Sequence, residues 1–282
     1  MPRIITIMGA GGAMGRRITR SLITMPQEYE LRLVEISEEG RARIAEEFGA
    51  TPVPQAEAVA GAETIVLATP DRIVGTVAAE LVPMMDPGSS LLSLDPAAAH
   101  AGRIPHREDI NVFACHPTHP PLYDLMAEES PEARRDFWGG GKAHQALVIA
   151  QVSGDQGVYD AVERLAQDMF APISRTHRIT IEHMALLEPA MSESVTNSCI
   201  ALIKKTRNLL IDMGVPEGAA KDFCMGHLQI GIALIFEELD WKLSAGAIQA
   251  QEEATEVLFK DDWERILQPE MVLKSTRSIT GG

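Results

Sequence analysis

Short runs rich in apolar and β-branched residues alternate with helical segments from residue 3 to about residue 180. The runs are RIITIMG, YELRLVEIS, TIVLATP, SLLSLDP, INVFACHP and ALVIAQVSG. Alternation of this kind is typical of a parallel sheet whose two faces are covered by helices. The pattern therefore predicts an α/β fold, with a doubly wound N-terminal domain over residues 1–180.

The pattern changes at Ile181, after which the β-rich runs end and long helical segments span 181–213 and 217–239. The stretch GHLQIGIALIF, residues 226–236, is apolar around its whole circumference. A helix of this kind is stable when it is buried on all sides. Because residues 181–282 are few for such a core, we expect an all-α domain that forms a homodimer.

The composition restricts the ligands of the chain. A formal net charge of −15 argues against nucleic acid and anionic membranes, which bind to basic surfaces. The three cysteines, Cys115, Cys199 and Cys224, are widely spaced and fit a reducing compartment rather than a disulfide framework. With no signal-like N-terminus and no apolar run long enough to span a bilayer, we expect a cytoplasmic protein that binds small molecules or protein.

A glycine-rich turn joins the first predicted strand to the first helix in IITIMGAGGAMGRR. Gly9, Gly12 and Gly15 have the spacing G-x-x-G-x-x-G, and Gly11 lies between them. Glycine lets the backbone turn tightly and approach a pyrophosphate, whose charge then lies at the helix N-terminus. A glycine triplet alone is a weak signal, but one that follows a strand and opens a helix predicts a dinucleotide-binding loop.

The end of the second strand bears on the choice of dinucleotide. Glu35 follows Gly15 by twenty residues, where a carboxylate commonly binds the adenosine ribose hydroxyls, and this favours NAD. Arg41 and Arg43 could instead meet the 2′-phosphate of NADP.

Two further strands end in small residues and proline, in LATPD (67–71) and LDPAA (94–98). Ligands bind at this edge of open α/β sheets, so Thr69 and Pro70 are candidate cofactor-binding residues. Plain strand-ending turns are the alternative.

The stretch CHPTHPP ends the predicted strand INVFA, next to the expected position of the nicotinamide. His116 and His119 could bind a metal, relay a proton from a substrate hydroxyl group or cap a turn. Pro117, Pro120 and Pro121 stiffen the loop and would preorganise whatever the imidazoles hold. We predict a catalytic or ligand role for both histidines. The later stretch WGGGK, 138–142, lacks the P-loop pattern, and we expect a turn into the next strand.

The segment IEHMALLEPAMSESVTNSCIALI carries polar residues among many apolar ones. Glu188, Ser192 and Glu193, with Asn197 one turn later, form a stripe that could face the cofactor. Pro189 removes a backbone hydrogen bond and is expected to bend the helix there. We predict that Glu188, Glu193 and Asn197 belong to the catalytic site, with a solvated face as the alternative.

Together, GAGGAMG, HPTHPPLY, DFWGGGKAHQALVIAQ and ALLEPAMSESV resemble the D-apionate oxidoisomerase family, which is similar to the 6-phosphogluconate dehydrogenase and ketol-acid reductoisomerase superfamily. The resemblance covers most of the chain and implies an NAD-binding Rossmann domain followed by a helical substrate and dimerisation domain. The residues that it implies for NAD contact are Gly11, Gly12, Ala13, Met14 and Glu35. It also implies that His116 and Glu188 are site residues, which could hold a divalent metal.

One position departs from the wider superfamily, whose 6-phosphogluconate-type members use a catalytic lysine in a K-x-x-x-N run. The matching run here is Glu193 to Asn197, with glutamate in the lysine position. A lysine-based mechanism is therefore not expected.

The resemblance implies that the C2 hydroxyl of apionate, a branched hydroxy acid, is oxidised by hydride transfer to NAD. A hydroxymethyl group then migrates in a ketol shift to give 3-oxo-isoapionate. The oxidation needs a base and the shift needs an electrophile, and His116 with Glu188 could supply both or hold Zn²⁺ or Mg²⁺, with His119 as a third ligand. A plain NAD(P)-dependent 2- or 3-hydroxy acid dehydrogenase and a non-enzymatic NAD(H) sensor are the alternatives.

Overall fold

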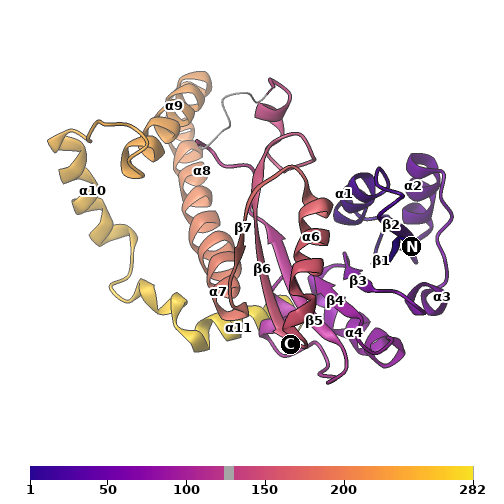
Figure 1. Ribbon diagram of the computed structural model, residues 1–282. Coiled ribbons are helices and arrows are strands. Elements are labelled where there is room, and N and C mark those ends of the chain that lie inside the picture. Colours follow the sequence, from indigo (N-terminus) through magenta and orange to yellow (C-terminus); the bar gives the residue numbers. More distant parts are fainter. Residues whose placement is uncertain (124–129, 282) are drawn as a thin grey trace. The chain divides into compact units, whose positions relative to one another are not determined.

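The computed structural model describes residues 1–123 and 130–281, which form two compact units (Figure 1). The first unit comprises Met1–Glu188 and Leu273–Gly282, and the second comprises Pro189–Val272. The end of the chain thus belongs to the same unit as its beginning.

The first unit is built on a seven-stranded sheet in the order β2-β1-β3-β4-β5-β6-β7. Its strands are β1 (Arg3–Met8), β2 (Tyr29–Val34), β3 (Thr64–Leu67), β4 (Ser90–Ser93), β5 (Asn111–Pro117), β6 (Gln145–Ser153) and β7 (Ile173–Arg178). Strands β1 to β5 are parallel, as predicted. Strand β6 is antiparallel to β5, which corrects the expectation of a parallel strand there. Strand β6 therefore begins at the end of the sheet where β5 stops, and this antiparallel pair needs no crossover helix.

Helices cover both faces of this sheet, as a doubly wound fold requires. They are α1 (Ala13–Leu22), α2 (Glu38–Phe48), α3 (Gln55–Val59), α4 (Asp71–Leu81), α5 (Ala97–His100), α6 (Tyr159–Phe170) and α7 (Ile181–Ala185), with the 3₁₀ segments η1 (Val82–Met84), η2 (Ala133–Arg135) and η3 (Gln156–Val158). One core cluster joins α1, α2 and α6 to the sheet and contains Ile7 and Phe113. A second joins α3, α4 and α5 to it and contains Ile65 and Leu81.

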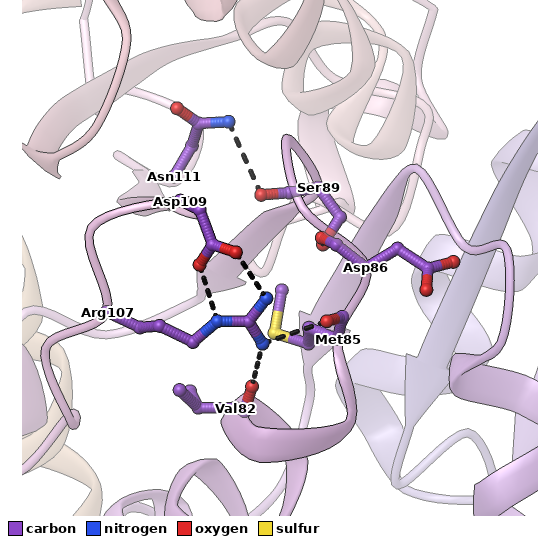
Figure 2. Close-up of polar contacts among 7 residues, drawn as sticks. All are labelled: Val82, Met85, Asp86, Ser89, Arg107, Asp109 and Asn111. Carbon is purple, nitrogen blue, oxygen red and sulfur yellow. Dashed lines mark hydrogen bonds and ion pairs between the residues drawn. The ribbon is translucent and has the colours of Figure 1, made fainter.

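Strand β5, which carries the histidine loop, is fixed at its start by polar contacts (Figure 2). Arg107 pairs with the carboxylate of Asp109 and donates to the carbonyl oxygen of Val82 at 2.6 Å. Asn111, the first residue of β5, donates to the carbonyl oxygen of Ser89 at 3.3 Å. These bonds hold the amino end of the strand, so the position of its carboxyl end depends little on the loop that follows.

A π-helix follows α7, in place of the continuous α-helix expected over residues 181–213. It is η4 (Leu186–Thr196), and α8 (Asn197–Asp212) continues from it. Pro189 lies inside η4 and has no N–H group to donate to the preceding turn. The wider π turn accommodates this loss, and Ser194 Oγ donates to the carbonyl oxygen of Pro189 at 2.7 Å. Glu188 therefore lies on a widened turn rather than on a bent α-helix.

The second unit is all-helical, as predicted. It contains α8, α9 (Glu217–Ile235), α10 (Ala245–Leu258), η5 (Trp263–Leu267) and the start of α11 (Pro269–Ile279). Only two residues of α9, Ala220 and Ala233, are buried in the single chain. The helix expected to be buried on all sides thus leaves Phe223, Met225 and Ile235 more than half exposed here. Within residues 1–123 and 130–281, no helix reaches both the length and the apolarity that crossing a membrane requires.

Candidate active site

The glycine loop forms a tight turn between β1 and α1. Gly9 has a φ of +74°, and a Cβ atom there would lie 2.6 Å from the carbonyl oxygen of Ala68. A Cβ atom at Gly15 would lie 2.4 Å from the carbonyl oxygen of Gly9, and the Gly12 N–H donates to that same oxygen at 3.1 Å. Neither Gly9 nor Gly15 can carry a side chain, and a backbone without side chains is what lets such a loop approach a pyrophosphate closely.

Helix α1 begins at Ala13, directly after this turn. Ala13 and Met14 thus lie in the first turn of the helix, where backbone N–H groups point out of the helix end. An anion such as a pyrophosphate is stabilised at this position.

Glu35 is bound to the glycine loop. Its Oε2 accepts from the N–H of Gly11 at 3.0 Å, and its Oε1 accepts from the N–H groups of Ile36 and Ser37 at 2.9 Å each. Burial alone would raise the pKa of Glu35, but the hydrogen bonds from Ser37, Gly11 and Ile36 outweigh it and lower the pKa. The carboxylate is therefore ionised, which disfavours a second anion beside it.

The two arginines considered for a 2′-phosphate contact the backbone instead. Arg41 Nε donates to the carbonyl oxygen of Glu35 at 2.9 Å, and Arg43 Nε donates to that of Gly11 at 3.0 Å. Glu35 and Arg41 line a cavity of about 590 Å³ that also contacts Thr51 and Val53. A carboxylate and a guanidinium group thus both line this cavity, and the Nε atom of each arginine is engaged by the main chain.

The chain between β3 and α4 borders the glycine loop. Thr69 Cγ2 lies 3.3 Å from the place where a Gly9 Cβ atom would be, and Pro70 is the N-cap residue of α4. Thr69 Oγ1 is buried and has no hydrogen-bond partner within the described part of the chain. A buried hydroxyl group of this kind is costly unless a ligand or water satisfies it.

The side chains of His116 and Glu188 face each other. His116 Nε2 lies 3.2 Å from Glu188 Oε1, and the two side chains are 23% and 17% exposed. His116 Nδ1 lies 2.9 Å from the carbonyl oxygen of Leu94, just after β4. Helix α7 reaches this edge because Met184 packs on Ala114 and Val148 of β5 and β6.

The bond to Leu94 decides which nitrogen of His116 carries hydrogen. A carbonyl oxygen only accepts, so Nδ1 donates, and Nε2 of the neutral ring presents a lone pair to the carboxylate. Burial lowers the pKa of His116 against the opposing effect of this bond, which favours the neutral ring. Two acceptor atoms at 3.2 Å repel each other unless a proton or a cation lies between them. The pair could therefore hold a cation or a transferable proton.

His119 lies near His116, with the ring centroids 6.0 Å apart, but it is held by a different loop. Its Nδ1 lies 2.9 Å from the carbonyl oxygen of Trp138. Trp138 belongs to the WGGGK stretch, which forms turns before β6, as expected.

Glu193 and Asn197 lie in the second compact unit, in η4 and at the start of α8. Their catalytic role stays a prediction. No group of three or more metal-ligating side chains occurs within residues 1–123 and 130–281.

Curated relatives match almost the whole chain. D-apionate oxidoisomerase of Rhizobium rhizogenes (strain K84 / ATCC BAA-868) is 37% identical over 277 residues, which cover 98% of this chain and 99% of that protein. The chain belongs to the D-apionate oxidoisomerase family. D-apionate oxidoisomerase of Cupriavidus necator is also 37% identical, with 99% and 100% of the two chains covered. The resemblance predicted from the motifs is thereby confirmed, and with it an oxidoreductase rather than a non-enzymatic sensor.

Family models and solved structures agree with this assignment to the D-apionate oxidoisomerase family. The model for the C-terminal region of decarboxylating phosphogluconate dehydrogenase matches residues 126–280, and that for coenzyme F420-dependent NADP oxidoreductases matches residues 4–95. A Cupriavidus necator structure, described as a semialdehyde dehydrogenase NAD-binding protein in complex with calcium and NAD, is 36% identical with a TM-score of 0.95 and covers 99% of this chain and 100% of that one. A ketol-acid reductoisomerase from an uncultured archaeon shares the fold, at 17% identity and a TM-score of 0.65 over 99% of this chain and 82% of that one.

Sequence reasoning missed the backbone acceptors that orient the two histidines. These acceptors are the main-chain carbonyl oxygens of Leu94 and Trp138, and the side chains of these two residues carry no signal of this role. It also missed Arg17, which is 2% exposed. The sequence did contain a signal for Arg17. It lies beside Ile18 and one turn before Ser21, on the side of the helix that faces the core, where a charged residue is rarely found unless it has partners.

Proposed function

We propose that this protein is an NAD-dependent oxidoisomerase that converts D-apionate to 3-oxo-isoapionate. Carbon C2 gives the hydride of its C–H bond to the nicotinamide while the C2 hydroxyl group gives its proton to a base, and a hydroxymethyl group then migrates within the resulting 2-keto acid. The names of the relatives support the substrate. The observation that carries the chemistry is the approach of His116 Nε2 to Glu188 Oε1 at 3.2 Å, at the sheet edge where the nicotinamide is expected.

The residues of the glycine loop fit NAD. Gly9 and Gly15 leave no room for a Cβ atom, and Thr69 Oγ1 is a buried hydroxyl group that a cofactor would satisfy. We assign the pyrophosphate to residues 9–15 and the adenosine ribose to Glu35. The ionised carboxylate would repel a 2′-phosphate, which favours NAD over NADP.

His116 Nε2 and Glu188 are the residues that would hold a divalent cation such as Zn²⁺ or Mg²⁺. When bound there, a cation would supply Lewis-acid polarisation of the substrate oxygens. The protein supplies the orientation: Leu94 fixes the tautomer of His116, and the turn of η4 presents Glu188 to it. The relative from Cupriavidus necator in complex with calcium and NAD supports a cation site in this family.

One experiment separates this function from that of a plain hydroxy acid dehydrogenase. The protein is incubated with D-apionate and NAD, NADH is followed by absorbance, and the carbon skeleton of the product is determined by NMR. We expect NADH together with a rearranged skeleton, and loss of the rearranged product after chelation. NADH with an unrearranged 2-keto acid would identify a plain dehydrogenase, and no NADH would refute D-apionate as the substrate.

We also propose that the protein is a homodimer formed through its second unit. Phe223, Met225 and Ile235 of α9 are 67%, 55% and 59% exposed in the single chain. An apolar cavity of about 460 Å³ lies beside Phe223 and contacts Leu202 and Leu210 of α8. Exposed apolar surface on this scale is typical of protein interfaces. The match of residues 126–280 to the phosphogluconate dehydrogenase C-terminal region supports a second copy as its partner.

A further inference from the structure

Residues 136–143, which we call the Asp136 loop, form a rigid turn between η2 and β6. The carboxylate of Asp136 accepts hydrogen bonds from three backbone N–H groups, those of Gly140 (2.6 Å), Lys142 (2.9 Å) and Ala143 (3.2 Å). These bonds lower the pKa of Asp136 although burial opposes them. A short loop that wraps around one ionised carboxylate has little freedom to change shape.

Arg17 joins the Asp136 loop to the helix that follows the glycine loop. Its guanidinium donates to the carbonyl oxygens of Gly139 (2.8 Å) and Ala171 (2.7 Å) and to Ser21 Oγ (2.5 Å). The side chain is 2% exposed, and the charge of Asp136 partly offsets the lowering of its pKa by burial. A buried cation is costly unless its donors are satisfied, so the loop is held tightly against α1.

The loop in turn holds His119. The carbonyl oxygen of Trp138 accepts from His119 Nδ1 at 2.9 Å, so Nδ1 carries the hydrogen and Nε2 of the neutral ring keeps a lone pair. His119 has a φ of +60°, a left-handed conformation that is rare for residues other than glycine. It also precedes Pro120, which restricts the preceding residue to extended conformations. Strain of this kind persists where the surrounding structure enforces it, and it is concentrated at functional sites.

We propose that the Asp136 loop is a positioning element that fixes His119 in the tautomer whose Nε2 accepts a hydrogen bond from a hydroxyl group of the polyhydroxy acid substrate. Asp136 and Arg17 act through the loop, and His119 contacts the substrate. With its ring centroid 6.0 Å from that of His116, His119 lies within reach of a substrate bound at the His116–Glu188 pair. The identity of the substrate rests on the proposed function, whereas the tautomer of His119 does not.

Kinetics of three variants test the proposal. Asp136→Ala removes the loop carboxylate, and His119→Asn removes the imidazole while keeping a residue type that tolerates a positive φ. We expect each to raise the KM for D-apionate by about three- to tenfold, the effect of losing one hydrogen bond, with kcat and the Kd for NAD close to wild type. The double variant should be no worse than either single variant, because both remove the same contact. KM effects that multiply in the double variant would overturn the proposal.

Asp155→Ala is the matched control, because Asp155 also accepts a backbone N–H bond, from Gly157 at 2.9 Å, but caps η3. Its KM should remain that of the wild type. Asp136→Asn keeps one acceptor oxygen and should give an intermediate KM. A KM increase for Asp155→Ala equal to that for Asp136→Ala would attribute the effect to general loop damage and overturn the proposal.

The tautomer of His119 can be observed directly by ¹⁵N NMR of histidine-labelled protein, with the His119→Asn variant used for assignment. We expect a hydrogen on Nδ1 in the wild type and a shift toward the Nε2–H tautomer in Asp136→Ala. An unchanged Nδ1–H tautomer in Asp136→Ala would overturn the proposal even if the KM rose. A wild-type protein that consumes no D-apionate would refute the proposed function, while the tautomer comparison would still decide whether the loop fixes His119.

Discussion

The kind of contact that His116 makes with Glu188 depends on one backbone atom, the carbonyl oxygen of Leu94. Without the carbonyl oxygen of Leu94, His116 could place its hydrogen on Nε2 and donate directly to the carboxylate, and the pair would be an ordinary hydrogen bond. With Leu94 accepting from Nδ1 at 2.9 Å, the pair requires a proton or a cation between its two acceptor atoms. A main-chain acceptor thus determines whether these two side chains could hold a proton or a cation between them.

Substitution of the pair tests this interpretation. His116→Asn and Glu188→Gln should each lower turnover by ~10²–10⁴, the usual contribution of a positioned acid–base group, and leave the Kd for NAD unchanged. The double variant should cost little more than either single variant, because residues that act as one unit are not additive. Steady-state kinetics and calorimetric NAD titration measure both quantities. Near-normal turnover of His116→Asn would show that its loop is a turn cap.

Glu35 offers a second test at the same scale. Glu35→Ala should weaken NAD binding by ~1–2 kcal/mol, the value of hydrogen bonds to a charged group, while binding of NADP should change little. Glu38→Ala is the control, because Glu38 lies in the first turn of the neighbouring helix α2. Isothermal titration of both dinucleotides against both variants gives the comparison, and an unchanged NAD affinity for Glu35→Ala would contradict the assignment.

At the level of elements, the glycine loop was predictable because its function requires a residue type. Gly9 has a φ of +74°, and a Cβ atom there would lie 2.6 Å from a carbonyl oxygen. Both features require glycine, so the glycine in the sequence was enough to predict the tight turn. Strand β7 was not predictable from its pattern, since ISRTHR is mostly polar and partly exposed at the edge of the sheet. The π-helix was missed as well, because a proline signals a lost hydrogen bond without showing how the helix accommodates it.

The glycine loop can be tested with a matched pair of substitutions. Gly9→Ala should destabilise the protein by ~1–3 kcal/mol and abolish NAD binding, because the methyl group would meet Ala68 and the backbone would be strained. Gly218→Ala in α9 should be neutral or stabilise by ~0.5–1 kcal/mol, because nothing lies within 4 Å of its Cβ position and alanine favours helix. Denaturant unfolding measures both, and equal stabilities would contradict the role assigned to Gly9.

For the molecule as a whole, the two units differ in how many apolar residues are buried within a single chain. The first unit buries two large clusters around its sheet, whereas α8 and α10 of the second unit have no buried residue and α9 has only two. From the sequence, the apolar circumference of α9 predicted that another surface covers this helix. The pattern could not identify the covering surface, because apolar periodicity indicates that a residue is buried but not which group buries it.

Placing a charge on that apolar surface tests the proposed dimer. Phe223→Asp should raise the dissociation constant of the dimer by about 10²-fold or more, because two copies of a phenylalanine would each lose ~1.5–3 kcal/mol of burial. Folding of the first unit should be unaffected, since Phe223 belongs to the second unit and is 67% exposed in the single chain. Met84→Asp, at a residue that is 40% exposed in η1, is the control and should remain dimeric. Sedimentation over a range of concentrations measures the change, and a wild-type monomer or a Phe223→Asp dimer of wild-type affinity would each refute the role of this surface.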